Sequence, residues 1–167
     1  MTKPTSADHS EFHARYVKLV PETDLLSAMR VQATVTQATL LAFADRPDHR
    51  YAPSRWSVRQ VLGHMADTER IFGYRTLSIA RGDAAPLPGV EQDEWMANSD
   101  FGLSSLEELL AGFQAVRSGN LSLLSGFTPA AWERRGVASG HTVTVRALAY
   151  MLLGHERAHL EVLRERY

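Results

Sequence analysis

The chain of 167 residues carries 18 Lys and Arg residues against 19 Asp and Glu residues, a formal net charge of −1. This balance argues against a general affinity for nucleic acid, and there is no dense basic cluster with interleaved aromatic residues. A hydrophobic content of 44% and a charged content of 22% are ordinary for a soluble globular domain. The chain has no cysteine, which excludes disulfides, thiolate metal ligands and a cysteine nucleophile.

Targeting and membrane segments are not expected. No apolar run approaches the roughly 18 residues that a membrane span requires, and the N-terminal segment lacks the continuous apolar stretch of a secretory signal. We therefore expect a cytoplasmic protein that binds neither membrane nor nucleic acid. The length predicts a single domain over residues 1–167, in which residues 1–20 form an irregular polar arm.

Two long helices are predicted in the first half of the chain. The first covers residues 22–44, where apolar side chains recur at helical spacing, and it ends before Pro47. The second covers residues 57–81. Ser57 and Gln60 have the spacing of a capping box at its start, and Gly82 is a natural stop.

Two further long helices are predicted in the second half. The third begins at Ser104, which forms a capping-box pattern with Glu107. A short helix is predicted at Pro129, and residues 134–145 can hold a short extended segment. The fourth long helix covers residues 143–164. Four amphipathic helices in this length predict an all-α four-helix bundle.

The connection between the second and third long helices, residues 82–103, is too long for a simple antiparallel turn. It can extend to roughly 70 Å, whereas the second helix is ~37 Å long. The chain can therefore run back along the bundle, so that the third helix lies parallel to the second. We interpret this connection as a lid or pocket wall, with Trp95 lining the pocket mouth, although packing in an interface or in the core would suit a tryptophan equally well.

Two histidines interrupt the apolar stripe of the fourth long helix. His155 and His159 are four positions apart, so they point the same way. Unpartnered polar groups in a core position cost several kcal/mol, and metal ligation removes that cost. His64, beside the apolar face of the second helix, is the best third ligand. Three imidazoles with one open position form the ligand set of a catalytic zinc-type site, which nickel, iron or copper would also accept.

Alternative interpretations of these residues stay open. His64 alone would more often be a hydrogen-bonded structural histidine. Asp67 and Glu156 are the nearest carboxylates in sequence that could accept the second N–H of a ligating histidine, although solvated surface charge is the commoner role, above all for Glu156. His141 precedes the fourth helix and would either approach the site or cap a loop.

One motif supports a minor alternative. His155, Glu156 and His159 match the H-E-x-x-H pattern of zinc metalloproteases letter for letter, with Glu156 in the position of the general base. Against this assignment, the chain lacks the sheet pattern that surrounds such a motif in zincins, and His64 lies upstream on another helix.

Taken together, the segments RWSVRQVLGHMADTERIF, QDEW and VRALAYMLLGHERAHLEVLRERY resemble the DinB-like superfamily, which includes the YfiT-type proteins. The resemblance covers most of the chain. It implies an up-down-down-up four-helix bundle and a divalent metal held by one histidine of the second helix and two of the fourth, which are His64, His155 and His159 here. Members of the family are described as metal-dependent hydrolases, and relatives use thiols such as bacillithiol or mycothiol.

The sequence thus predicts a metal-dependent enzyme, either a hydrolase or a thiol-dependent transferase, with zinc or nickel as the expected ion. Its substrate would be a small molecule, joined in a transferase by a low-molecular-weight thiol from solution, since the chain has no cysteine. A homodimer is expected from the family and from the prevalence of symmetric dimers. The alternative is a non-catalytic metal-binding bundle, whose site would be closed by a fourth ligand such as His141 or Asp67.

Overall fold

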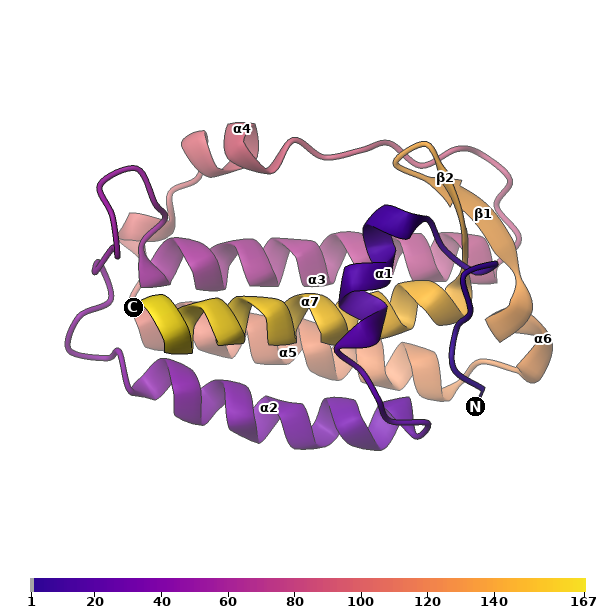
Figure 1. Ribbon diagram of the computed structural model, residues 1–167, viewed down its shortest axis with the longest axis horizontal. Coiled ribbons are helices and arrows are strands. Elements are labelled where there is room, and N and C mark those ends of the chain that lie inside the picture. Colours follow the sequence, from indigo (N-terminus) through magenta and orange to yellow (C-terminus); the bar gives the residue numbers. More distant parts are fainter. Residues whose placement is uncertain (1) are drawn as a thin grey trace.

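The computed structural model describes residues 2–167, and in this part of the chain four long helices form a bundle (Figure 1). The long helices are α2 (Leu25–Leu41), α3 (Val58–Ala80), α5 (Leu106–Ser125) and α7 (Val145–Arg166). The shorter elements are α1 (Glu11–Lys18), α4 (Gln92–Ala97), the 3-10 helix η1 (Phe101–Leu103), α6 (Pro129–Glu133), β1 (Arg135–Ala138) and β2 (His141–Thr144).

The order of the long helices is up-down-down-up. Figure 1 shows α3 and α5 running in the same direction, while α2 and α7 run the opposite way. The segment between α3 and α5 returns along the outside of the bundle and carries α4 and η1. The fold class and topology predicted from the sequence are therefore confirmed. None of the helices in the described part of the chain is long and apolar enough to cross a membrane.

Local capping signals fix where these helices begin. The capping box of α3 is formed by Ser57 and Gln60, as predicted. The box of α5 lies one residue later than predicted, because Ser105 and Glu108 form it while Ser104 ends η1 in an extended conformation. The residues SSLEE fit both registers, so the preceding 3-10 turn decides between them.

The fourth long helix also starts later than the sequence pattern predicted, at Val145 instead of residue 143. Residues 141–144 pair with residues 135–138 in an antiparallel hairpin, so they are extended rather than helical. The side chain of Thr144 then caps α7 by accepting a hydrogen bond from the backbone N–H of Ala147. The extended segment foreseen at residues 134–145 is this hairpin.

The N-terminal segment, expected to be irregular, contains helix α1, whose His13 and Val17 are buried. It packs against α7 so closely that a Cβ added at Gly154 would lie 2.0 Å from the carbonyl oxygen of Tyr16. An eight-residue helix is marginal by itself in water, so this contact with α7 stabilises it. That contact is invisible in the local sequence pattern.

A buried ionic cluster links all four long helices. Arg117 of α5 makes two hydrogen bonds to Glu69 of α3, of 2.8 and 2.9 Å, and its Nη1 lies 2.7 Å from a carboxylate oxygen of Glu156 on α7. Asn120 donates to Glu69, and Thr36 of α2 donates to Glu156. Since these side chains are almost wholly buried, the cluster fixes how α3 and α7 face each other.

Candidate metal centre

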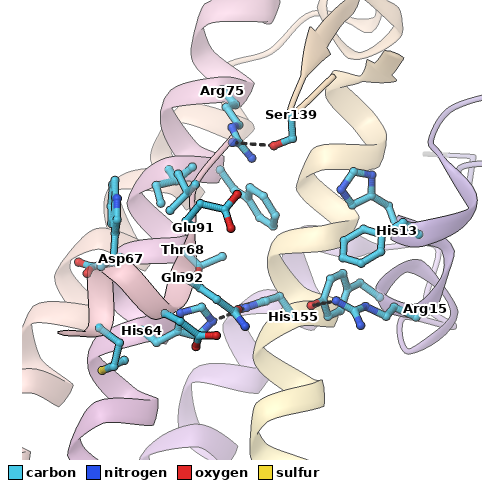
Figure 2. Close-up of a pocket in the computed structure, with 18 of the residues that line it drawn as sticks. His13, Arg15, His64, Asp67, Thr68, Arg75, Glu91, Gln92, Ser139 and His155 are labelled. Carbon is cyan, nitrogen blue, oxygen red and sulfur yellow. Dashed lines mark hydrogen bonds between the residues drawn. The ribbon is translucent and has the colours of Figure 1, made fainter. Parts of the chain in front are cut away.

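The structure brings His64, His155 and His159 together between α3 and α7. The Nε2 atom of His155 lies 3.1 Å from Nε2 of His64 and 3.1 Å from Nε2 of His159. One nitrogen from each of the three rings falls within 4.8 Å of the other two. Figure 2 shows the rings of His64 and His155 pointing toward each other from the two helices.

Burial keeps these imidazoles uncharged at neutral pH. His155 is 6% exposed, and His64 and His159 are half-buried. Burial lowers the pKa of His64 to about 4, with the charge of Asp93 acting in the opposite direction. Burial, followed by the neighbouring His64, lowers the pKa of His159 to about 3, and the pKa of His155 also lies well below its usual range. Neutral imidazole is the form that ligates metals.

The arrangement fits a divalent transition metal. Three neutral imidazoles share one focus, and each offers Nε2, the atom that commonly ligates zinc. Within residues 2–167, no Cys, Asp or Glu joins this group. Three protein ligands without a fourth would leave a coordination position for water or substrate.

A pocket of about 470 Å³ opens onto the histidines. Its volume lies in the range of roughly 300–1,000 Å³ that is usual for small-molecule sites. One wall is formed by α3, a second by α1, and a third by the connection that carries α4 (Figure 2). His64 and His155 line it directly, and the connection contributes Trp95, for which the sequence left pocket lining and packing equally open.

Three other residues named in the sequence analysis lie in different surroundings. Asp67 lines the pocket, but its carboxylate is 3.3 Å from Arg70, and burial raises its pKa. His141 is exposed on the hairpin, with its ring 5.7 Å from that of His13, and it does not belong to the group of three histidines whose ligand atoms lie within 4.8 Å of one another. The carboxylate of Glu156 points into the core, toward Arg117.

The position of Glu156 bears on the metalloprotease alternative. A general base in an H-E-x-x-H motif must face the metal and its water. Glu156 is 1% exposed, and its two oxygens contact Thr36 and Arg117 instead. The motif is therefore matched in letters only, because the carboxylate of Glu156 faces Arg117 and Thr36 rather than the three histidines.

The sequence pattern did not point to several of the residues that line the pocket. From α1, the ring of Tyr16 lies 5.4 Å from that of His155, and Arg15 lines the same pocket. From the connection, Asp93 lines the pocket and acts electrostatically on His64. Arg75 of α3 lines its far end. Of these residues, Arg75 alone could have been found from the sequence, because it lies three helical turns beyond His64 on the same face of α3.

Comparisons with known proteins agree with this fold. The DinB superfamily model matches residues 28–163, and the comparison with curated proteins found no match. Among solved structures, YfiT from Bacillus subtilis aligns with a TM-score of 0.75 at 17% identity, over 98% of this chain and 90% of that one. YfiT is described as a probable metal-dependent hydrolase with an unusual four-helix bundle topology. At this identity the likeness shows the fold alone. Because the family model spans most of the chain, the protein belongs to the DinB superfamily.

Proposed function

We propose that the protein is a metal-dependent hydrolase in which His64, His155 and His159 hold one divalent ion. A single observation carries the proposal: three neutral imidazoles converge at one end of a pocket large enough for a small molecule. The description of YfiT as a probable metal-dependent hydrolase supports the same chemistry. Zinc and nickel are the ions we expect first, because both accept imidazole ligands.

The histidines and the pocket walls would have distinct roles in this reaction. The three histidines bind through Nε2 and stay uncharged, because their pKa values are lowered by burial. A divalent ion in this position supplies Lewis acidity, which makes water or a thiol a stronger nucleophile near neutral pH. The pocket walls from α1 and the α4 connection orient the substrate and exclude bulk water.

Asp93 is our candidate for the proton acceptor. It lines the same pocket as His64, from α4, and its charge raises the pKa of His64 against the larger effect of burial. Glu156 cannot take this role, because both its oxygens are engaged in the core. A carboxylate beside the ligands is the group that water-activating sites use to accept a proton.

The proposal is tested by activity against a panel of small esters and amides, with protein as purified, after chelation, and after zinc or nickel is restored. Hydrolysis that is lost on chelation and returns with metal supports it. Asp93→Asn should lower kcat by about 10²-fold or more while metal content stays at the wild-type level. Glu91→Gln, a change at another exposed carboxylate of the same wall, is the matched control.

Thiol-dependent transfer would use the same ion, so the panel is repeated with bacillithiol, mycothiol and glutathione. Because the chain has no cysteine, a transferase must take its thiol from solution. In the cobalt-substituted protein, a bound thiol would add a sulfur-to-metal charge-transfer band, and turnover of an electrophile would require the thiol. Absence of any turnover, together with an ion that exchanges no water, would favour the non-catalytic metal-binding bundle instead.

A further inference from the structure

One face of α3 runs the length of the pocket and carries a charge at its far end. Thr68, Ile71 and Arg75 lie four, seven and eleven positions beyond His64, so all four share one helix face, and all line the pocket. The Cα atoms of His64 and Arg75 are separated by ~16 Å along the helix axis. Figure 2 shows the guanidinium of Arg75 at the opposite end of the pocket from His64.

Arg75 is a buried cation without an acidic partner. Its side chain is 6% exposed, and its Nη2 atom donates to the carbonyl oxygen of Pro88 at 2.6 Å and to Oγ of Ser139 at 3.0 Å. Both acceptors are neutral. Within residues 2–167, no carboxylate oxygen lies within 4.0 Å of its guanidinium nitrogens in an ion pair. Burial lowers the pKa of Arg75, yet an arginine remains charged at neutral pH.

The other two buried arginines of the described chain have acidic partners. Arg117 lies between two buried carboxylates, and Arg146 pairs with Asp8 and Glu133. Buried charges are expensive unless they are paired, and these two follow that rule. Arg75 does not follow this rule, and of the three arginines it is the one whose side chain lines the pocket. A ligand in the pocket can supply the missing negative charge.

Other charged groups around the pocket do not replace such a ligand. Glu91 and Asp93 line the pocket from the α4 connection, but among the described residues neither forms an ion pair with Arg75, and Asp67 pairs with Arg70. Burial lowers the pKa of His13 to about 4, so it adds no charge at neutral pH. Arg15 lines the pocket from α1 as a second, more exposed cation without a carboxylate within 4.0 Å among the described residues.

We propose that Arg75 binds the terminal anionic group, a carboxylate or a phosphate monoester, of the small molecule that occupies this pocket. The anion would lie beside Arg75 and Ser139, and the rest of the molecule would extend along Thr68 and Ile71 toward the three histidines. The placement of the reacting end at the histidines rests on the proposed function, whereas anion binding at Arg75 does not. The substrate class is thus an extended small ester or amide that carries a terminal anionic group, rather than a neutral one.

The test measures binding by calorimetry with three probes of similar length: hexanoate, hexanamide and hexyl phosphate. The protein is used both as purified and after chelation, because a carboxylate can also bind an ion directly. Arg75→Gln removes the charge and Arg75→Lys keeps it. Arg30→Gln, at an exposed arginine of α2 outside the pocket, is the matched control. Thermal unfolding of each variant shows whether it is folded.

Wild-type protein should bind hexanoate or hexyl phosphate at least about tenfold more tightly than hexanamide, with or without metal. Arg75→Gln should abolish that preference, Arg75→Lys should retain part of it, and Arg30→Gln should leave it unchanged. The tighter of the two anions identifies the ligand group. Equal binding of hexanoate, hexyl phosphate and hexanamide by the wild-type protein would overturn the proposal even if Arg75→Gln fails to fold. A preference that survives in folded Arg75→Gln would overturn it too. Because metal content is measured separately, a protein that prefers anions but holds no metal would refute the proposed function and leave this inference standing.

Discussion

His64 and His155 lie 91 positions apart in the chain, yet their Nε2 atoms are 3.1 Å from each other across the interface of α3 and α7. Nothing in either helix alone creates this proximity. It depends on the register between the two helices, which the apolar packing and the buried ionic cluster of Arg117 determine. The candidate metal centre is therefore a property of the whole bundle, and the predictions below test both the bundle and the site.

The close approach of α1 to α7 should be sensitive to one methyl group. Gly154→Ala would place a Cβ 2.0 Å from the backbone oxygen of Tyr16, and backbone cannot yield as a flexible side chain can. We expect α1 to detach, which would be seen as faster hydrogen exchange over residues 11–18 and lower thermal stability. Gly119→Ala, at a helical glycine of α5 with open space around it, should instead raise stability by up to about 1 kcal/mol. Unchanged exchange in Gly154→Ala would contradict the observed packing.

The buried ionic cluster should respond strongly to the loss of its cation. Arg117→Leu would leave Glu69 and Glu156 buried without a counter-charge, which we expect to lower the free energy of unfolding by about 3–5 kcal/mol. The more exposed pair of Arg70 and Asp67 is the comparison, since Arg70→Ala should cost less than about 1 kcal/mol. Urea unfolding of both variants measures the difference. Equal effects would show that the buried cluster does not hold the bundle together.

Acid should weaken the fold in part through His13. Burial, then the nearby charges of His141 and His9, lowers the pKa of His13 from 6.5 to about 4. Between these two pH values the unfolded chain binds a proton at this site that the folded chain does not, so the free energy of unfolding falls as the pH falls. Above pH 6.5 both states are neutral and the contribution is constant.

His13→Gln should therefore reduce the slope of stability against pH between pH 6.5 and 4, by up to about 1.4 kcal/mol per pH unit. Denaturant unfolding at several pH values gives the two curves, and His49→Gln at an exposed position is the control. Curves for wild type and His13→Gln that stay parallel throughout this window would show that His13 is not held neutral by the fold.

The pH dependence of metal affinity should reflect the lowered pKa values of the buried imidazoles. Protons compete with a metal for free imidazole near pH 6.5, but the pKa values of His64 and His159 are about 4 and about 3 here. We expect affinity to stay nearly constant from pH 7 to about 5 and to fall below that. Competition with a coloured chelator at each pH measures it. A decline centred near pH 6.5 would mean that the histidines are solvated in the metal-free protein.

The fold was largely predictable because its main elements leave a periodic signal. The apolar spacing in residues 58–80 and 145–163, and the long connection after Gly82, suffice for a bundle with α3 and α5 parallel. Boundaries were less predictable. Ser104 and Ser105 offer equivalent caps, and residues 141–144 join a hairpin whose partner strand lies outside the local window.

The histidine cluster could be located from the sequence because polar residues in an apolar stripe stand out. The rest of the pocket could not. Arg15 and Tyr16 reach it from a helix that tertiary contact stabilises, and Asp93 reaches it from an irregular connection. The ion pair between Glu156 and Arg117 could not be predicted either, because no pattern in either helix indicates a pair separated by 39 positions in sequence.

The central claim is that three histidines hold one metal ion, and the most direct measurement is the metal content of natively purified protein and its histidine variants. We expect about one transition-metal ion per chain in the wild type, and a sharp loss in His64→Ala, His155→Ala and His159→Ala. His141→Ala, at the exposed hairpin histidine, should keep the wild-type content. Full occupancy in His64→Ala, or a wild-type protein that takes up no metal even when zinc or nickel is supplied in excess, would contradict the account.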